Sequence, residues 1–284
     1  MCDYAYIHDC IIIDNMRSPS SYGGKGIIKQ VIYPTRISGA AELSKYIRQG
    51  YKVIGACTNT LVSDGKVTTP VICTKKLKGI LHCSNGLYAL AGENLPSLCT
   101  VAAEYGLSGM EELSGIPGSV GGGAVMNCGC FGKEISQIIE YVDIAVNGKI
   151  QRLAAKDIPW GYRSSSLEGE GIIVGVKFNL TSSDVSLVRK RMREIGEMRL
   201  TQPKQPSLGS TFKRHDGVSA GYYIDKAGLK GAKVGGAMIS DIHAGFIVNT
   251  GGGSADDYIK LMGVARDKVQ DVFGITLQPE IVLL

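Results

Sequence analysis

The sequence of 284 residues predicts a mixed α+β fold, and three observations support this prediction. Short apolar runs that suit strands occur along the whole chain, and segments with helical periodicity separate them. The strands and helices show no regular βαβ alternation. The composition, with 44% hydrophobic and 20% charged residues, is that of a globular protein with a core large enough for two or three subdomains.

The first part of the chain is predicted to be rich in strands. We expect strands at 27–34 and 51–56, with a helix at 40–50 between them that ends at a glycine. Residues 70–94 are predicted to form further strands with an Asn-Gly turn at 85 and 86, because this dipeptide suits a tight hairpin. A helix is expected at 95–107.

The second part begins with a predicted hairpin over 141–155, which turns at Asn147-Gly148, and a buried strand at 170–180. A charged amphipathic helix at 186–200 ends before QPKQP, the best candidate for a domain boundary. Beyond it we expect a helix in GYYIDKAGLKG, two strands in 232–250, a long helix capped by Ser254 and a terminal strand at 275–284.

Charge and hydropathy indicate a protein that acts on a small molecule. The net charge of +5 is spread along the chain without a basic run, so we expect no nucleic acid partner, whereas a small anionic ligand would need only a few cations. No segment approaches the ~20 apolar residues of a membrane helix. The N-terminus lacks the order of a signal peptide. We therefore expect no membrane association and a location in the cytoplasm.

The eight cysteines all lie in the first half, without a CxxC pair or a histidine at metal-binding spacing. Reduced thiols are therefore expected, and no metal. The alternative concerns Cys128 and Cys130, whose side chains would point the same way in an extended segment and could form a disulfide or half of a metal site.

Two glycine-containing stretches are candidates for ligand binding. The strand that ends at Gly55 runs into CTNTLVSDG, which either offers backbone N–H groups to a phosphate or forms a plain turn. The stretch GIPGSVGGGAVMNCGCFGKEI (115–135) contains seven glycines. Backbone without side chains allows the close approach of either an extended ligand or another chain segment, and the stretch lacks the βαβ frame of a dinucleotide-binding turn.

The stretch 115–135, preceded by GLSGMEELS, resembles the flavin-binding signature of the UDP-N-acetylenolpyruvoylglucosamine reductase family, whose members complete the muramic acid precursor of peptidoglycan. The resemblance extends over most of the chain from about residue 20. Further stretches are similar to the family in the same order: GACTNTLVSD, GYRSSSL (161–167), QPSLGSTFKRHDG (205–217), GLKGAKVGGAMISDIHAGFIVNTGGGSADD (228–257) and LQPEI (277–281).

The resemblance implies an FAD-binding fold of the vanillyl-alcohol-oxidase type with two subdomains, at 1–74 and 75–200, that hold FAD between them. A smaller α+β substrate-binding domain would follow at 201–275, and the terminal strand at 276–284 would return toward the flavin. The implied reaction is the NADPH-dependent reduction of UDP-N-acetylglucosamine enolpyruvate to UDP-N-acetylmuramate. The expected partners are the UDP-sugar and NADPH, and we expect a monomer.

The family's catalytic arginine, serine and glutamate correspond to Arg163, Ser210 and Glu280. Hydride addition to the enolpyruvyl double bond leaves negative charge on the substrate carboxylate, which a guanidinium and a carboxyl group stabilise through hydrogen bonds. A serine hydroxyl can then supply the proton.

The resemblance also implies binding residues. Lys213 and Arg214 would hold the substrate diphosphate or carboxylate, or form a solvated pair, and His243 would line the substrate site or lie in the core. The residues implied for FAD binding are Gly55, Thr58, Asn59, Thr60, Leu61, Gly115, Ile116, Gly118, Ser119, Gly122, Asn127, Gly129, Ile173 and Arg199.

The chain also departs from the family pattern. Cys57 stands where the first flavin loop commonly has a glycine, and PSSYGG is shorter than the family's usual segment. The residues between Gly209 and Glu280 are too few to include the tyrosine-loop insertion of the family's long form, so the chain resembles the short form. These departures keep two alternatives open: an oxidoreductase of the same fold with another substrate, or a ligand-binding paralogue without activity.

Overall fold

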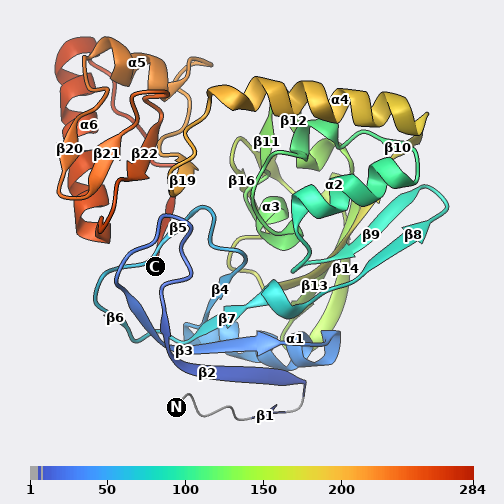
Figure 1. Cartoon of the computed structure of the whole chain (residues 1–284). Helices are drawn as coiled ribbons and strands as arrows, with labels where there is room; N and C mark the ends of the chain where they lie inside the picture. The colour runs from blue at the N-terminus through green and yellow to red at the C-terminus, as the bar shows by residue number, and fades with distance from the viewer. Residues whose placement is uncertain (1–5, 8) are drawn as a thin grey trace. The chain divides into compact units, whose positions relative to one another are not determined.

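The structure is a computed structural model that describes residues 6–7 and 9–284, and it divides into two compact units (Figure 1). Unit 1 comprises Met1–Asp14, Gln30–Ala56 and Thr69–Arg199, and unit 2 comprises Asn15–Lys29, Cys57–Thr68 and Leu200–Leu284. The division predicted at 1–74, 75–200 and 201–275 stays a prediction. Cys2 lies outside the described residues.

Unit 1 contains most of a six-stranded sheet with the strand order β1-β2-β3-β7-β4. The end of β2 from Asn15 and the start of β3 up to Lys29 are assigned to unit 2, where Ile27 and Ile28 of β3 pair with β6 (Lys66–Val67). β3, β7 and β4 pair in parallel, and α1 supplies Ala40 and Leu43 to a core that also contains Ile32 and Ile72. The elements are β1 (Tyr6–Ile7), β2 (Cys10–Arg17), β3 (Ile27–Pro34), α1 (Ile37–Leu43), η1 (Ser44–Gln49), β4 (Lys52–Ile54), β7 (Val71–Cys73) and η2 (Thr74–Lys76).

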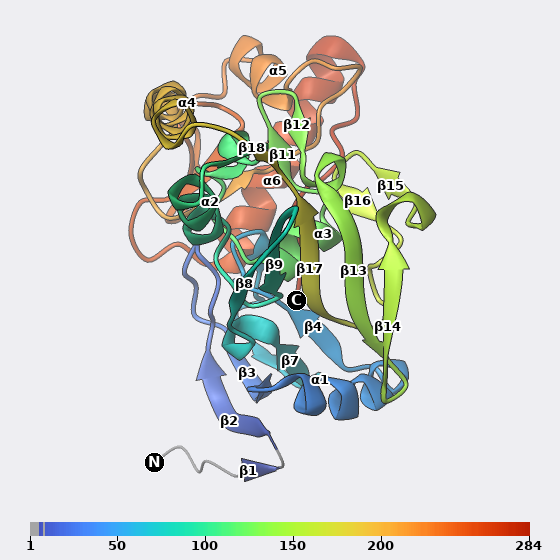
Figure 2. The same ribbon diagram turned by 90° about the vertical axis from the view of Figure 1, so that its right-hand side faces the viewer.

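A second, antiparallel sheet of unit 1 has the order β14-β13-β17-β9-β8 (Figure 2). Both predicted hairpins are confirmed, one between β8 (Ile80–Cys83) and β9 (Gly86–Leu90) and the other between β13 (Ile139–Val146) and β14 (Lys149–Ala154). The second turns at Asn147-Gly148 as predicted, whereas the first turns one residue earlier than predicted, at Ser84-Asn85, because Cys83 pairs with Gly86. The predicted buried strand is β17 (Ile172–Asn179), in which seven of eight residues are buried. Its two-sided burial explains its continuous apolar run.

Helices complete unit 1 around this sheet. α2 (Leu95–Glu104) is capped by Asn94, α3 (Val120–Val125) contacts β17 and β9, and α4 (Val185–Met198) contacts α2. The short elements are β10 (Leu107–Ser108), η3 (Glu111–Leu113), β11 (Gly129–Cys130), β12 (Lys133–Glu134), η4 (Ile135–Gln137), η5 (Ala155–Asp157), β15 (Trp160–Gly161), β16 (Ser164–Ser165), β18 (Thr181–Ser182) and η6 (Arg199–Thr201), the last crossing the boundary between the units.

Unit 2 is built on the antiparallel sheet β19-β22-β21-β20 with α5 and α6. Ser254 caps α6 as predicted, because its hydroxyl accepts a hydrogen bond from the Asp257 N–H. The elements are β5 (Thr60–Leu61), β6 (Lys66–Val67), β19 (Ser207–Ser210), α5 (Ala220–Lys226), β20 (Lys233–Val234), β21 (Ala237–Ile239), β22 (Phe246–Asn249), α6 (Ala255–Phe273) and β23 (Val282–Leu283).

Segments far apart in the sequence share the core of unit 2. Tyr22 from the first segment is 0% exposed, and its ring packs edge-on against Tyr258 of α6 with the centroids 4.9 Å apart. Burial raises the pKa of Tyr22 to about 12, so the phenol is neutral at pH 7. Leu61 of the second segment joins the same cluster. All three segments are therefore needed to complete this core.

Several predicted elements need correction. The helix predicted at 40–50 begins earlier, as α1, and tightens into the 3₁₀ helix η1 before Gly50, whose φ of 91° ends it. The region predicted to hold two strands, 232–250, contains three, because β20 and β21 form a short hairpin. The terminal strand is limited to β23, since Pro279 has no N–H to donate. Within the part of the chain that the structure describes, no helix combines the length and the apolar character needed to span a membrane.

Candidate active site

The glycine-rich stretch of unit 1 forms a bend around the start of α3. Ser119 caps this helix by accepting a hydrogen bond from the Gly122 N–H, and its side chain is buried. Gly55, at the end of the strand before the first loop, lies against the same serine: a Cβ at Gly55 would come within 2.4 Å of the Ser119 hydroxyl. The structure thus brings together the two glycine-containing stretches that the sequence predicted as binding elements.

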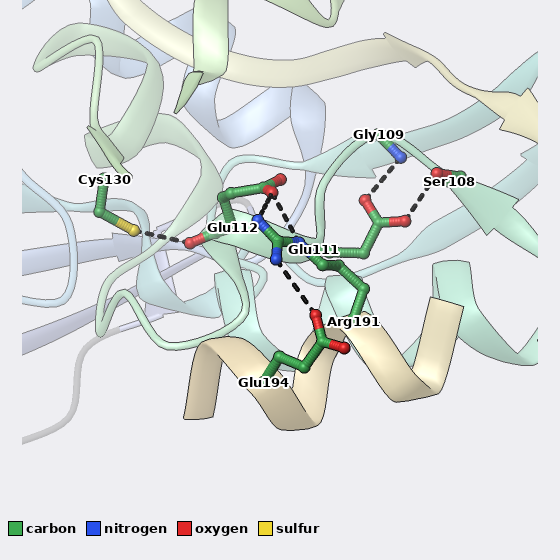
Figure 3. Close-up of polar contacts among 7 residues, drawn as sticks. All are labelled: Ser108, Gly109, Glu111, Glu112, Cys130, Arg191 and Glu194. Atoms are coloured by element: carbon green, nitrogen blue, oxygen red, sulfur yellow. Dashed lines mark hydrogen bonds and ion pairs between the residues drawn. The ribbon is translucent and has the colours of Figure 1, made fainter. Parts of the chain in front are cut away.

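Arg199 lies across the beginning of this stretch. A Cβ at Gly115 would come within 2.3 Å of the Arg199 Cδ, so a side chain there would displace the arginine from this position. Arg199 follows α4, and α4 is tied to the turn before Gly115 because Arg191 forms an ion pair with Glu112, with 3.0 Å between Nη2 and Oε1 (Figure 3). Contacts of α4 therefore hold Arg199 beside the glycine stretch, while its predicted role in binding FAD stays a prediction.

The turn itself, η3, is braced by Glu111, whose buried carboxylate accepts hydrogen bonds from the Ser108 hydroxyl and the Gly109 N–H (Figure 3). The thiol of Cys130 donates to the Glu112 carbonyl oxygen at 2.7 Å. Burial raises the pKa of Cys130, although Arg199 and Arg163 offset part of this effect, and burial raises the pKa of Cys128 to about 12. Both thiols are therefore protonated at pH 7, and no group of three or more potential metal ligands occurs within residues 6–7 and 9–284.

Arg163 stands at the tip of the hairpin formed by β15 and β16. Its backbone has a φ of 54°, and its Nη2 donates a hydrogen bond to the Gly129 carbonyl oxygen at 2.5 Å. The guanidinium lies 4.9 Å from the centre of the Tyr162 ring. The hairpin thus places the predicted catalytic arginine against the last glycines of the glycine-rich stretch.

Asn127 links this hairpin to the glycine-rich stretch. Its side chain is 0% exposed, and its amide nitrogen donates to the Gly161 carbonyl and the Glu134 carboxylate at 2.9 Å each. Its amide oxygen accepts from the Ser136 N–H. These bonds indicate that the Asn127 side chain connects chain segments, while its predicted role in binding FAD stays a prediction.

We expect Asn127→Ala to lower the free energy of unfolding by about 3 kcal/mol, because buried backbone groups lose their partners. Asn147→Ala is the matched control: Asn147 also has a positive φ, 48° against 40° for Asn127, but its side chain is exposed in a hairpin turn. That variant should lose only about 1 kcal/mol. Urea denaturation measures both, and equal losses in the two variants would contradict the linking role of Asn127.

The first loop continues into unit 2 at Cys57, which stands where the resemblance indicates a glycine. Cys57 is buried and has a φ of 56°, a conformation that favours glycine, and its carbonyl oxygen accepts a hydrogen bond from the Ser21 N–H. The loop therefore keeps the backbone conformation that a glycine would adopt, with a thiol side chain added.

Cys57→Val should lower the free energy of unfolding by about 2 kcal/mol, because a β-branched side chain is strained at positive φ. Cys57→Gly should change it by less than about 1 kcal/mol, since relief of strain is offset by the entropy of the unfolded chain. The control is Cys73→Val, because Cys73 is equally buried but has a φ of −110°. If the two valine variants denature at the same urea concentration, the strain at Cys57 is absent.

Ser210 lies at the end of β19 in unit 2. Ser207 pairs with Val248 and Ser210 with Phe246, so β19 carries one residue more than β22 over this stretch and forms a bulge. Gly209 lies in the bulge with a φ of 77°. A bulge of this kind redirects the side chain that follows it, and Ser210 is exposed. The next residue, Thr211, is buried and its hydroxyl lies 3.0 Å from the Tyr258 hydroxyl.

Glu280 is held close to Ser210 along the backbone. Its N–H donates to the Thr211 carbonyl oxygen at 2.9 Å, and its own carbonyl oxygen accepts from the Asn59 side chain at 2.9 Å. Phe212 and Pro279 form an isolated bridge beside these bonds. The structure therefore brings together three residues that the sequence assigned separately: Asn59, Ser210 and Glu280.

The candidate substrate-binding residues lie in the same unit. Lys213 donates its N–H to the Gln278 carbonyl, and the guanidinium of Arg214 donates to the Gly217 carbonyl at 3.3 Å in a local turn. His243 accepts a hydrogen bond from the Gly245 N–H on Nδ1, and burial lowers its pKa, so it is neutral at pH 7 and its other nitrogen is the donor. Their binding roles stay predictions.

The remaining predicted FAD residues are distributed over both units. Ile173 belongs to the hydrophobic core of unit 1, whereas Ile116 and Gly118 lie within the glycine-rich bend and Thr58, Thr60 and Leu61 continue the first loop in unit 2. Sequence reasoning missed Glu134, Thr211 and Tyr258. Their roles depend on partners distant in the sequence, so no local signal could have indicated them.

Comparisons with known proteins show which family this chain is similar to. Residues 202–284 match the family model described as the C-terminal domain of UDP-N-acetylenolpyruvoylglucosamine reductase. The UDP-N-acetylenolpyruvoylglucosamine reductase of Streptococcus pneumoniae (strain JJA) is 37% identical over 261 residues, which are 89% of this chain and 87% of that protein. The enzyme of the same name from Rubrobacter xylanophilus is 37% identical over 81% of this chain and 78% of its own.

Among solved structures, UDP-N-acetylenolpyruvylglucosamine reductase from Thermus caldophilus is similar over the whole chain. The TM-score is 0.83 at 32% identity, and the match covers 100% of this chain and 99% of that chain. The predicted α+β fold is confirmed. The vanillyl-alcohol-oxidase type of its FAD-binding part stays a prediction.

Proposed function

Because this chain belongs to the UDP-N-acetylenolpyruvoylglucosamine reductase family, we propose that Arg163, Ser210 and Glu280 carry out the chemistry of that reaction. The protein is an FAD-dependent oxidoreductase that uses NADPH to reduce UDP-N-acetylglucosamine enolpyruvate to UDP-N-acetylmuramate, a step in the synthesis of peptidoglycan precursors. The UDP-sugar and NADPH are its substrates.

The residues of the glycine-rich bend fit FAD. Gly55 has no side chain where a Cβ would meet Ser119, Gly122 follows the same serine, and Arg199 offers a cation across Gly115. Side chains at these glycines would cover backbone that an extended cofactor can approach. Bound FAD would supply the transfer of hydride from NADPH to the enolpyruvyl double bond.

Arg163 would bind the substrate carboxylate. A guanidinium binds two carboxylate oxygens through parallel N–H donors, and it stabilises the negative charge that develops as hydride adds to the double bond. One Arg163 nitrogen is held by the Gly129 carbonyl, which orients the guanidinium before substrate binds. Preorganised charge of this kind stabilises a transition state without reorganisation.

Ser210 and Glu280 would act in the same half-reaction as Arg163. The exposed Ser210 hydroxyl would donate the proton to the carbanionic carbon, and the Glu280 carboxyl would share a hydrogen bond with the substrate carboxylate. The observation that carries this proposal is the backbone bond between Glu280 and Thr211, because it fixes the two residues in one unit within a few bonds of each other.

The first experiment is the visible spectrum of the purified protein under anaerobic conditions. We expect flavin absorption bands that bleach with NADPH and return when UDP-N-acetylglucosamine enolpyruvate is added. A protein whose reduced flavin ignores this sugar but reacts rapidly with oxygen would instead be an oxidoreductase with another substrate. A colourless protein that binds the sugar would be the inactive paralogue.

We further propose that Lys213 and Arg214 bind the substrate diphosphate. His243 would donate a hydrogen bond to the sugar from its protonated ring nitrogen, Nε2. We also propose that the protein is a monomer in the cytoplasm. Sedimentation at several concentrations tests the first of these two properties, and cell fractionation tests the second.

A further inference from the structure

The backbone of Glu280 is fixed from two sides by residues that are far from it in the sequence. Its N–H is bound by the Thr211 carbonyl and its carbonyl is bound by the Asn59 side chain, both at 2.9 Å. When both polar groups of one residue are bound in this way, the position and direction of its Cα–Cβ bond follow from its partners. The partner on one side, Thr211, directly follows β19, and the partner on the other side, Asn59, belongs to the first loop.

Asn59 holds the C-terminal segment at two points. Besides the bond from its amide to Glu280, its backbone carbonyl accepts a hydrogen bond from the Val282 N–H at 2.9 Å. The parallel pairing of β5 with β23, Thr60 with Val282, continues this contact. The backbone bond survives any substitution, whereas the side-chain bond to Glu280 depends on the amide N–H of asparagine.

We propose that Asn59 is a positioning residue for the Glu280 carboxyl, in addition to any contact it makes with FAD. The inference rests on the proposed role of Glu280 in reducing the enolpyruvyl substrate. Without the amide donor, Glu280 loses one of its two backbone anchors and its carboxyl samples several positions. A misplacement of about 1 Å at a reacting group can cost about a hundredfold in rate.

The first test separates the two half-reactions in stopped-flow measurements on FAD-loaded protein. In Asn59→Ala, the rate at which UDP-N-acetylglucosamine enolpyruvate restores the flavin bands should fall about tenfold or more, and the rate at which NADPH bleaches them should stay within about twofold of wild type. Asn59→Asp, which keeps the size but removes the N–H donor, should behave in the same way.

Ser63→Ala is the matched control. The Ser63 hydroxyl donates to the Leu284 carbonyl at 2.9 Å, so this variant also removes one side-chain bond to the C-terminal segment, but a bond that does not reach Glu280. Both half-reactions should remain within about twofold of wild type. If Ser63→Ala slows the second half-reaction as much as Asn59→Ala, a general loosening of the segment explains the effect and the inference is overturned.

A second readout is the dissociation constant of FAD, measured by flavin fluorescence on protein stripped of cofactor. If Asn59 acts only as a cofactor ligand, Asn59→Ala raises this constant while the loaded fraction restores its flavin bands at the wild-type rate. That combination overturns the inference. A slowed second half-reaction in the loaded fraction supports it whatever the change in FAD affinity.

The double variant shows whether Asn59 acts through Glu280. If it does, adding Asn59→Ala to Glu280→Gln slows the second half-reaction by less than about twofold, because the group to be positioned is already changed. Independent, multiplying losses overturn the inference. If the second half-reaction is slow in Glu280→Gln but has the wild-type rate in Asn59→Ala, only the inference is overturned. If it has the wild-type rate in Glu280→Gln, the proposed role of Glu280 is overturned, and the inference with it.

Discussion

Ser210→Ala should slow the reduction of UDP-N-acetylglucosamine enolpyruvate at least about 100-fold, while NADPH still reduces the bound flavin at nearly the wild-type rate. The physical reason is that only the second half-reaction needs a proton on carbon. A positioned general acid contributes about two to four orders of magnitude. The bulge of β19 turns the Ser210 side chain outward, and loss of its oxygen leaves the buried Thr211 anchor in place.

Stopped-flow absorbance measures both half-reactions of Ser210→Ala. Ser207→Ala is the control, because it removes a hydroxyl from the same strand at the position paired with Val248. It should leave both rates within about twofold of wild type. Equal slowing of the two half-reactions in Ser210→Ala would indicate that Ser210 supports the structure of the site instead of donating the proton.

Arg163→Lys should also slow the second half-reaction, by about 100-fold. Lysine keeps the positive charge but loses the planar pair of donors that a carboxylate needs. It also keeps a Cβ, so the cost of the left-handed backbone, with a φ of 54°, is the same as for arginine. The loss therefore reports the geometry of the donors, including the Nη2 donor to the Gly129 carbonyl, and not a change in backbone strain.

Chemical rescue gives the sharpest test of this role. Guanidinium ion added to Arg163→Ala should restore the second half-reaction at least about tenfold, because it supplies the missing donors within the space of the deleted side chain. The same additive should leave Ser210→Ala unchanged. If neither Arg163→Lys nor Arg163→Ala reduces the rate, another cation stabilises the substrate carboxylate.

Local chemistry explains why part of the fold could be predicted. The Asn147-Gly148 dipeptide specifies a tight hairpin because both positions of the turn need positive φ, as observed at 48° and 83°. At the first Asn-Gly dipeptide only Gly86 has a positive φ, 123°, and it pairs with Cys83 as the first residue of β9. Ser254 indicated the start of α6 because its hydroxyl satisfies a helix N–H. These signals act within a few residues and therefore can be read from the sequence.

Other features depend on partners distant in the sequence. The change from α1 to the 3₁₀ helix η1 has no residue signature of its own. Cys57 has a left-handed backbone conformation, which is typical of glycine, so a cysteine at this position gave no indication of it. In the candidate site, motifs identified Ser210 and Glu280, but the bond through Thr211 that joins them arises only in the folded chain.

The threading of the chain through unit 2 determines when that unit can fold. Its first two segments, Asn15–Lys29 and Cys57–Thr68, are synthesised before residues 69–199, and its last segment follows. At ~10 residues per second this gap lasts roughly 10 s on the ribosome. During that time Tyr22 and Leu61 lack the partners that bury them. Conversely, a fragment that starts at Leu200 would have a core that lacks the side chains of Tyr22 and Leu61. The folding unit is therefore larger than the C-terminal region matched by the family model, and it is completed only after residues 200–284 have been synthesised.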